Sequence, residues 1–574
     1  MMAFLALAFS LAVALATAAT SAAGAATDAG AVTSAAAAAA GADAAAPECA
    51  GVSDGLSAVR VEYDSRLSAA GHMSALLFAP SSDGELKAID ADSGRELWRF
   101  IAPEVLAATV LTGLMTDIAV LRFDANDDGV IDAAGGDRVW LYFGLKRAGA
   151  YYYALDVTRR TPRVLWAADR AAVPGLAEAW STPTIARVRV AGATQNGEHF
   201  VVIVGGGFSR DSTAAGNHLF MLDAATGRVL WSAGVDSSSD LVLSHMTHGV
   251  AARVTALDTD GDGFADRLYT ADVGGRVWRF DVWNGRARDR LVTGGVFASL
   301  GNAEPVSPSP APPASPAPPG SSAPPASPTP PASSAPVASP ASSDARRFFV
   351  APDVALMQPR GLEAWYNLAI GSGDGEDVRA AGVRNRFYSL RDRNPFVMHS
   401  QSDYDAASPL LDADLPDIAA GPPRDDAPGW KLDLTSGEAV LSESVTAGGV
   451  VMFTTHQSGA SAEGAFCASD DTNRVYAVHV DLGTAALDLN GDARVTDADR
   501  SAVLEQKGIP AAVRIELPPP GPVASGEPPA PGTPELPPTA PAHASNCLVG
   551  AELLNACVPL DAVLRTFWKS TSVN

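Results

Sequence analysis

Two short acidic segments have the residue spacing of a metal-binding loop. Residues 124–132 (DANDDGVID) and 258–266 (DTDGDGFAD) both follow the pattern D-x-[DN]-x-D-G-x-x-D. Oxygen side chains at alternate positions of a tight turn converge on one point, and hard oxygen ligands in this number suit Ca²⁺ better than Mg²⁺ or a transition metal. The predicted ligands are Asp124, Asn126, Asp128, Asp132 and the carbonyl of Val130 in the first loop, and Asp258, Asp260, Asp262, Asp266 and the carbonyl of Phe264 in the second. An acidic turn that binds nothing is the alternative, and carboxylate repulsion disfavours it.

A third segment, within residues 484–510, is similar to an EF-hand or dockerin-type calcium loop. Its predicted ligands are Asp488, Asn490, Asp492, the carbonyl of Arg494, Thr496 and the closing Asp499. Ala493 stands where such loops normally need glycine, so the turn is expected to be strained. The residues that follow, RSAVLEQKG, are predicted to form a short helix.

The other polar motifs do not point to catalysis. No G-x-S-x-G elbow frames a serine nucleophile, and no carboxylate pair is left over for acid–base chemistry once the acidic loops are assigned. Four cysteines occur without a CxxC or CxxCH motif: Cys49, Cys467, Cys547 and Cys557. An even number in an exported chain favours disulfides, with three connectivities open and Cys547–Cys557 the most local. The sequence therefore predicts a protein that is not an enzyme.

The net charge of the chain and its apolar segments indicate which binding partners and which cellular compartment to expect. The formal net charge of −24 disfavours binding to nucleic acid. Residues 1–25 form an apolar run ending in small residues, typical of a signal peptide, and an Ala-rich segment follows at 26–48. Because no Lys or Arg precedes Arg60, a misplaced start codon is the alternative. No further apolar run is long enough for a membrane span, so none is predicted in the mature chain.

A repeated strand–turn pattern must position these loops. Large apolar residues alternate before a polar turn in six segments: 86–98, 152–166, 219–231, 277–285, 387–395 and 475–483. The first three continue into a second strand that ends in Trp98, Trp166 or Trp231. A spacing of about 60–70 residues suits one four-stranded blade with insertions. The pattern LDaatGrvlW is shared by quinoprotein-like propellers, so the predicted fold is an all-β propeller of about seven blades; two stacked β-sandwiches are the alternative.

Composition divides the chain further. Residues 303–343 and 517–543 are so rich in proline that neither strand nor helix is expected, and both are predicted to be disordered. The propeller is predicted to span residues 49–510, interrupted by the first tract. A C-terminal segment, residues 544–574, follows the second tract.

Four segments resemble the propeller of PilY-type proteins of type IV pilus biogenesis: residues 115–157, 246–282, 370–392 and 466–483. Strand, aspartate loop and glycine turn recur there in one order. The resemblance implies a modified propeller controlled by calcium, located at the pilus tip, the outer membrane surface or the periplasm of a Gram-negative bacterium. The implied partners are type IV pilins or minor pilins, and a host or abiotic surface. The implied role is support of pilus extension, adhesion and twitching motility.

Two departures from the family pattern leave alternatives open. Members of the family usually carry a large N-terminal adhesive region, whereas here the propeller pattern begins almost at once. Either the chain is a fragment, or it keeps the assembly role alone. Two other functions compete: an exported quinoprotein-type dehydrogenase, disfavoured because the chain has no adjacent cysteines, and a generic outer-membrane propeller scaffold, which needs no calcium loops.

Overall fold

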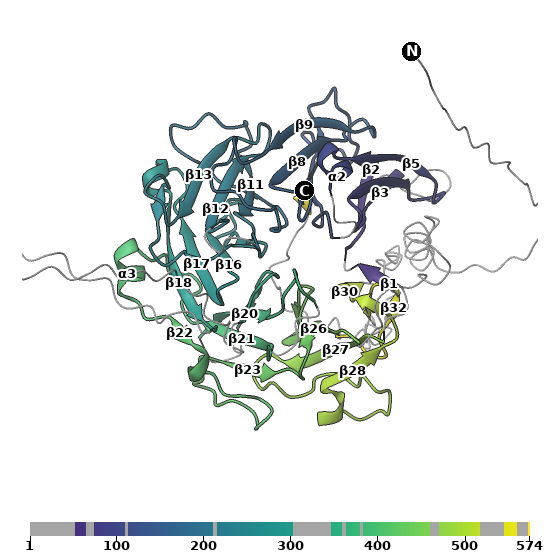
Figure 1. The fold of residues 1–574 in the computed structure, drawn as a ribbon, viewed down its shortest axis with the longest axis vertical. Coiled ribbons are helices and arrows are strands. Elements are labelled where there is room, and N and C mark those ends of the chain that lie inside the picture. Colours follow the sequence, from purple (N-terminus) through teal and green to yellow (C-terminus); the bar gives the residue numbers. More distant parts are fainter. Residues whose placement is uncertain are drawn as a thin grey trace, which may run out of the picture.

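The chain folds almost entirely into β-strands, as the alternating apolar residues predict. The computed structural model describes residues 52–54, 56–64, 74–108, 113–210, 215–301, 346–358, 363–378, 383–459, 470–516, 545–558 and 572–573. Seven sheets surround a common centre and form a seven-bladed β-propeller (Figure 1). The predicted all-β propeller is therefore confirmed, and the alternative of two stacked β-sandwiches is wrong.

The main strands of blades 1 to 4 come from residues 59–299, and in each blade the chain runs outward from the innermost strand (Figure 1). Blade 1 consists of β2 (Val59–Asp64), β3 (Ser74–Pro80), β4 (Glu85–Asp90) and β5 (Glu96–Ile101). Blade 2 consists of β6 (Ala119–Phe123), β7 (Arg138–Leu145), β8 (Tyr151–Asp156) and β9 (Arg163–Ala168), with β33 (Ser572–Val573) paired to β6. Blade 3 consists of β10 (Thr184–Arg187), β11 (Phe200–Gly205), β12 (His218–Asp223), β13 (Val229–Gly234) and β14 (Leu241–Val242). Blade 4 consists of β15 (Thr255–Leu257), β16 (Arg267–Ala271), β17 (Arg276–Val282), β18 (Val292–Ser299) and β22 (Leu410–Leu411).

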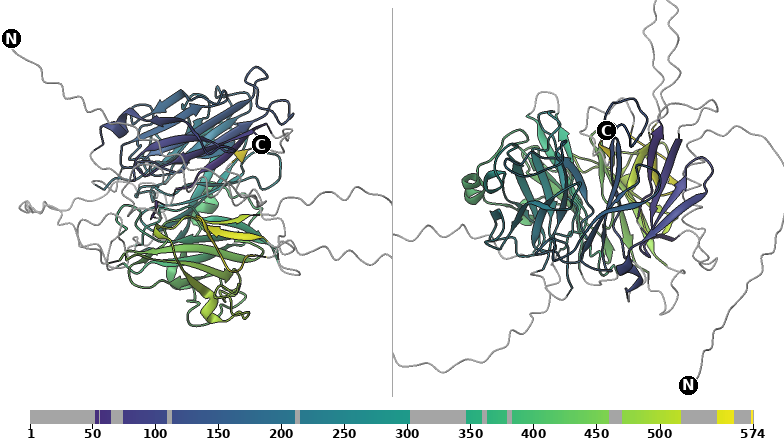
Figure 2. Two further views of the ribbon diagram at one scale, coloured as in Figure 1. Left: turned by 90° about the vertical axis from the view of Figure 1, so that its right-hand side faces the viewer. Right: turned by 90° about the horizontal axis from the view of Figure 1, so that it is seen from above.

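Blades 5 to 7 complete the ring, and Figure 2 shows them, green to yellow, on the opposite side from the first blades. Blade 5 consists of β19 (Asp353–Met357), β20 (Trp365–Gly371), β21 (Arg386–Asp392) and β23 (Gly429–Asp433). Blade 6 consists of β24 (Glu438–Ala439), β25 (Val445–Ala447), β26 (Val450–Gln457), β27 (Thr472–His479) and β28 (Ser501–Leu504). Blade 7 consists of β30 (Val513–Glu516), β31 (Asn546–Val549) and β32 (Glu552–Leu553).

Helices in the described residues are short. They are α2 (Pro103–Leu106), α3 (Gln401–Ala406) and the 3-10 turns η2 (Arg288–Arg290), η3 (Asp412–Asp414) and η4 (Asp497–Arg500). None of them has the length or the apolar content that a membrane span requires.

The six repeated segments contain the third strand of blades 1 to 6, and a tryptophan of the next strand joins one blade to another. Trp98 Nε1 in blade 1 donates to the carbonyl of Arg160 in the outer turn of blade 2, at 2.7 Å. Trp166 Nε1 in blade 2 donates to the carbonyl of Ala224 in blade 3, at 3.0 Å. Gly227 lies directly against the Trp166 ring, where a Cβ would come within 2.7 Å, so glycine is needed at this turn.

The hydrophobic core is divided among the interfaces between blades. One cluster between blades 2 and 3 contains Leu121, Tyr142, Trp166, Val202 and Phe220. Similar clusters lie between blades 1 and 2, between blades 3 and 4, across blades 4 to 6, and between blades 6 and 7. Face-to-face packing of sheets buries both faces of a blade, which explains why β11, β12, β16 and β17 are buried along their whole length.

The two ends of the described chain pair with strands that are distant in the sequence. β1 (Val52–Asp54) pairs in parallel with β29 (Lys507–Ile509), beside blade 6. β30 pairs with β31, so the strands on both sides of residues 517–543 belong to one sheet. The two predicted proline-rich tracts, the predicted signal peptide and the Ala-rich segment lie outside the described residues.

Candidate metal centre

The three acidic loops all lie on one face of the propeller. The first joins β6 to β7 and the second joins β15 to β16, so both follow the innermost strand of a blade. The third joins β27 to β28, the third and fourth strands of blade 6. Because antiparallel strands reverse direction at each connection, the loops after the first and third strands of a blade emerge on the same face.

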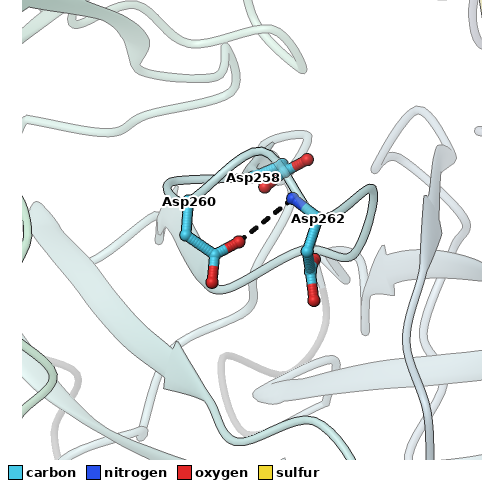
Figure 3. A group of neighbouring side chains, drawn as sticks. All are labelled: Asp258, Asp260 and Asp262. Carbon is cyan, nitrogen blue, oxygen red and sulfur yellow. Dashed lines mark hydrogen bonds between the residues drawn. The ribbon is translucent and has the colours of Figure 1, made fainter.

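The second loop brings three carboxylates together. One oxygen each of Asp258, Asp260 and Asp262 lies within 4.8 Å of the others (Figure 3). Asp258 is half-buried and accepts hydrogen bonds from Gly261 N at 2.7 Å and Gly263 N at 2.8 Å. Both glycines have positive φ angles, 81° and 85°, which allow the chain to turn around the Asp258 side chain. Among the residues that the structure describes, this is the one group of three acidic side chains placed so closely.

The end of the second loop is held by Phe264 and Asp266. The guanidinium groups of Arg187 and Arg189 each lie over the buried Phe264 ring, 4.6 Å from its centre. Asp266 Oδ2 accepts from the backbone N of Thr259 at 2.7 Å and from its hydroxyl at 2.9 Å. Burial raises the pKa of Asp266, and repulsion from Asp260 and Asp258 adds to the increase. A cation bound between these carboxylates would relieve this repulsion.

The first loop repeats this backbone geometry with an amide in one position. Asp124 Oδ2 accepts from Gly129 N at 2.9 Å, as Asp258 Oδ2 accepts from Gly263 N. Asn126 Oδ1 accepts from Asp128 N at 3.1 Å, and Asp128 Oδ1 accepts from Val130 N at 2.8 Å. The other oxygen of Asp124, Oδ1, is buried and has no hydrogen-bond partner. An unsatisfied buried oxygen beside further oxygen donors fits a hard cation such as Ca²⁺.

In the first loop Asp137, and not Asp132, accepts a backbone hydrogen bond from the loop's second residue, as Asp266 does in the second loop. Asp137 Oδ1 accepts from Ala125 N at 2.8 Å, and its Oδ2 accepts from Asp132 N at 2.7 Å. The carboxylate of Asp132 accepts instead from Ala134 N, at 2.9 Å. Asp137 thus holds the second residue of its loop, as Asp266 holds Thr259. The pattern D-x-[DN]-x-D-G-x-x-D missed Asp137 because this residue lies five positions after Asp132, where the pattern ends.

A dipeptide in the sequence could have identified Asp137. Each loop ends in an Asp-Arg pair directly before or at the start of the next strand: Asp137-Arg138 before β7, Asp266-Arg267 before β16 and Asp499-Arg500 before β28. In all three, the aspartate accepts a backbone N–H from the beginning of its own loop. The constant feature is therefore the pair at the strand, and the number of residues before it varies.

The third loop has the same turn, with Ala493 in the position that Gly129 and Gly263 hold in the other two loops. Asp488 accepts from Gly491 N at 2.8 Å and from Ala493 N at 2.7 Å. Asn490 Oδ1 accepts from Asp492 N at 2.9 Å, and Asp492 Oδ1 from Arg494 N at 2.9 Å. Ala493 has a φ of 65°, a left-handed conformation that costs energy for any residue with a Cβ. The expected strain at this position is present.

The end of the third loop differs from the sequence prediction. Thr496 caps η4: its side chain accepts from Ala498 N, and Asp499 accepts from Thr496 N at 2.9 Å. This hydrogen bond lowers the pKa of Asp499. The predicted helix after the loop is wrong, because residues 501–504 form β28 and pair with β27 to complete blade 6. Pairing with the blade outweighs the local preference of these residues.

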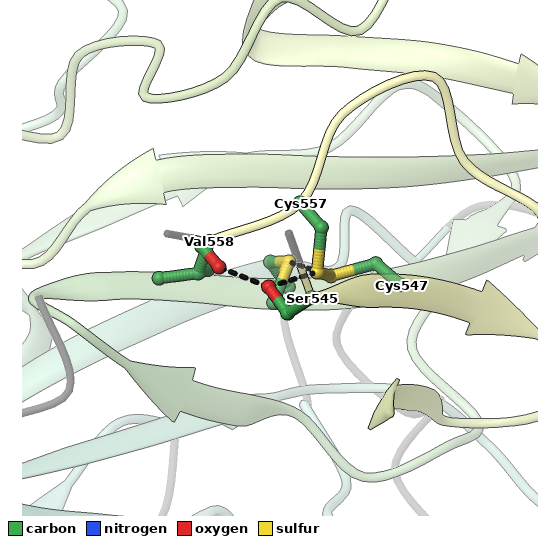
Figure 4. The surroundings of a disulfide bond; sticks show 5 residues. Ser545, Cys547, Cys557 and Val558 are labelled. Carbon is green, nitrogen blue, oxygen red and sulfur yellow. Dashed lines mark hydrogen bonds between the residues drawn. A yellow bond between two sulfur atoms is a disulfide. The ribbon is translucent and has the colours of Figure 1, made fainter. Parts of the chain in front are cut away.

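A disulfide lies in blade 7, close to the third acidic loop, since its cysteines share a hydrophobic cluster with Leu489 of that loop. Cys547 on β31 is bonded to Cys557, ten residues later, and Ser545 donates to Cys557 Sγ (Figure 4). The most local of the possible pairings is therefore the one that the structure contains. Cys49 and Cys467 lie outside the described residues.

The fold and the loops define the class of protein, a seven-bladed β-propeller with acidic loops. Comparison with known proteins shows which members of this class the chain resembles. No family model matches the chain. The resemblance to PilY-type proteins is confirmed: the chain is 26% identical over 226 residues to the type IV pilus biogenesis factor PilY1 of Pseudomonas aeruginosa strain UCBPP-PA14, and 26% identical over 240 residues to a PilY1 homolog of Xylella fastidiosa. These matches cover 38% and 41% of this chain, but only 18% of each of these curated relatives.

A solved structure gives the same fold. The C-terminal domain of Pseudomonas aeruginosa PilY1 superposes with a TM-score of 0.53 at 16% identity, over 84% of this chain and 92% of that domain. The similarity to this domain extends over the propeller as a whole.

Proposed function

We propose that this protein is a calcium-dependent, non-catalytic factor of type IV pilus biogenesis. The cluster of Asp258, Asp260 and Asp262 on a PilY1-like propeller is the observation that carries the proposal. The relatives that match part of the chain are named as type IV pilus biogenesis factors. The protein would act outside the inner membrane of a Gram-negative bacterium, with pilins or minor pilins, and would support pilus extension, adhesion and twitching motility.

Calcium would be held by oxygen donors of the three loops. In the second loop these are the carboxylates of Asp258, Asp260, Asp262 and Asp266 together with the carbonyl of Phe264. In the first and third loops they are the ligands predicted from the sequence. A bound divalent cation supplies charge neutralisation, and the loops then present one fixed shape on their face of the propeller. The fixed surface is the part of the molecule that a pilin would recognise.

Complementation of a deletion strain tests this proposal. A variant that carries Asp258→Asn, Asp260→Asn and Asp262→Asn keeps the shape of the loop but removes its charge. We expect the variant protein to be exported normally. The strain that carries it should lack surface pili and twitching. Asp289→Asn is the control, because Asp289 is an exposed carboxylate on the same face that belongs to none of the three loops. Normal piliation of the triple variant would contradict the role of calcium, and normal piliation of the deletion strain would contradict the pilus function itself.

A further inference from the structure

The third acidic loop is packed against blade 7, the blade that contains the disulfide. Leu487 and Leu489 stand on either side of the predicted ligand Asp488 and are only 7% and 4% exposed. Both leucines belong to the hydrophobic cluster that also contains Cys547 and Cys557. In Figure 1 blade 7, with β30 and β32, lies directly beside β27 and β28, the strands that this loop joins. The position of Asp488 is therefore set in part by the neighbouring blade.

A hydrogen bond from blade 7 reaches the backbone of the loop. Asn555 Nδ2 donates to the carbonyl oxygen of Leu489 at 3.0 Å. The same peptide group carries the N–H of Asn490, which donates to Asp499 Oδ1 at 3.2 Å. Asp499 is the residue that closes the loop. One peptide group between the first two predicted ligands is thus held by the loop itself on one side and by blade 7 on the other.

The other two loops do not bury the equivalent residue. Leu489 is the second residue of its loop, and the corresponding residues are Ala125, which is exposed, and Thr259, which is partly exposed. The third loop also carries Ala493 in a left-handed conformation, with a φ of 65°, that costs energy. A loop with a strained turn depends more on contacts from outside, and for the third loop blade 7 supplies them.

The disulfide restricts the position of Asn555. β32 has two residues and pairs with the end of β31. After it, Leu554 N donates to the carbonyl of Cys547 at 2.9 Å, and the disulfide joins Cys557 to the same residue (Figure 4). Asn555 thus lies between two attachments to Cys547, and one of them is covalent. A covalent cross-link removes alternative conformations of the segment that it closes.

We propose that Asn555 and the Cys547–Cys557 disulfide are positioning residues of the third calcium loop, so that this loop binds calcium tightly only in the oxidised chain. The inference rests on the proposed function, because it takes the third loop as a calcium site. In the reduced chain, calcium has to order the start of the loop as it binds, and the lost conformational entropy lowers the affinity. The first and second loops belong to blades 2 and 4, and their affinity does not depend on the disulfide.

The redox step is an ordinary thiol–disulfide exchange. The thiols of Cys547 and Cys557 give up two protons and two electrons, and the oxidant, a disulfide compound or a disulfide-bearing protein, is reduced to two thiols. Cys547 is fully buried whereas Cys557 is partly exposed, so the exchange takes place at Cys557. Because such bonds persist in oxidising compartments outside the cytoplasm, the third site would form only there.

Calorimetric titration with calcium tests the proposal on a chain in which only the third loop can bind. The first and second loops are inactivated by Asp124→Asn, Asp128→Asn, Asp258→Asn, Asp260→Asn and Asp262→Asn. We expect the dissociation constant for calcium to rise at least about tenfold when Cys547→Ala and Cys557→Ala are added. Reduced dithiothreitol should produce the same loss in the chain with its cysteines, and oxidised dithiothreitol should restore the affinity.

A matched chain keeps the second loop instead, with the first and third loops inactivated by Asp124→Asn, Asp128→Asn, Asp488→Asn and Asp492→Asn. Its affinity should change less than about twofold when the two cysteines are replaced. An equal loss at the second loop would overturn the proposal, since the disulfide would then act on the whole fold. Equal affinity of the third loop with and without the disulfide would also overturn it, as would an oxidised third loop that binds no calcium beside a second loop that does. Absence of calcium binding at every loop would contradict the proposed function as well.

Hydrogen–deuterium exchange in chelator tests the positioning role without metal. Asn555→Ala keeps the disulfide and changes an exposed side chain, so the chain is expected to fold. The backbone amides of residues 488–493 should exchange several-fold faster in this variant, and its third loop should bind calcium about three- to tenfold more weakly, since one hydrogen bond is lost. Asn546→Ala, at an exposed asparagine of β31, is the matched control. Unchanged exchange of residues 488–493 both in Asn555→Ala and without the disulfide would overturn the proposal.

Discussion

Asp266 is the residue at which electrostatics most directly favours a bound cation. Its pKa is raised by burial and by the carboxylates of Asp260 and Asp258. A raised pKa in the folded state means that the folded chain holds this proton more tightly than the unfolded chain does. Without metal, the chain therefore loses stability as the pH rises from the ordinary range of a carboxyl group through the raised pKa, and the loss is complete above it.

Asp266→Asn is expected to remove this pH-dependent loss. The amide oxygen can still accept from Thr259, while the charge is gone. In chelator, the melting temperature of the variant should exceed that of the wild type at pH 7.5 by about 2 °C or less, since the group is half-exposed and screened, and the difference should shrink at pH 4. Thermal melting at several pH values measures this. A difference that grows toward low pH would contradict the sign, and Asp289→Asn provides the baseline.

Substitutions of Asp132 and of Asp137 are expected to have different effects, the first on metal binding and the second on the stability of the loop. Asp137→Asn keeps only one of two acceptors for the N–H groups of Ala125 and Asp132, so it should cost about 1–3 kcal/mol without metal. Asp132→Asn should leave the metal-free melting temperature nearly unchanged but reduce the calcium response. Melts with and without calcium measure both effects. Asp127→Asn is the control inside the same loop, because Asp127 has a positive φ that asparagine tolerates and is not a predicted ligand. If Asp132→Asn kept the full calcium response, the sequence-based ligand would be wrong.

At the scale of elements, the third loop is limited by its backbone. Ala493→Gly removes the cost of a left-handed alanine, about 1–2 kcal/mol, and adds back about 0.5–1 kcal/mol of chain entropy. The net gain should be roughly 0.5 kcal/mol, together with tighter calcium binding at this loop. Gly491→Ala, at a φ of 76° in the same loop, is the matched control and should destabilise it. Chemical denaturation measures both changes; equal effects of the two substitutions would contradict the strain argument.

Strand periodicity and loop spacing were sufficient to predict much of this architecture from the sequence. The alternating residues of 86–98, 152–166 and 219–231 predicted the hairpins β4–β5, β8–β9 and β12–β13, because a half-buried strand repeats every two residues. The helix expected after residue 499 was wrong because pairing of β28 with β27 depends on contacts outside the segment. Asp137 was missed because the loop before it is longer than the pattern allows.

At the scale of the molecule, the ring explains why three loops that are distant in the sequence emerge on one face. Hydrogen bonds from Trp98 and Trp166 to the next blade fix neighbouring sheets, and the core clusters lie between the sheets. Each acidic loop is therefore anchored on two strands of a packed sheet. No local sequence pattern predicts the cavity at the centre of the ring, because it is lined by residues as distant as Lys146, Asp353 and Arg514.

The measurement that tests the central claim most directly is calorimetric melting of the purified chain at about 1 mM free calcium and in chelator. For a site with a dissociation constant of ~10 μM, calcium should stabilise the folded chain by about 2.7 kcal/mol and raise the melting temperature by a few degrees. The variant with Asp258→Asn, Asp260→Asn and Asp262→Asn should lose the largest share of this shift, and magnesium should not replace calcium. Identical melts with calcium and with chelator would contradict calcium binding by the propeller.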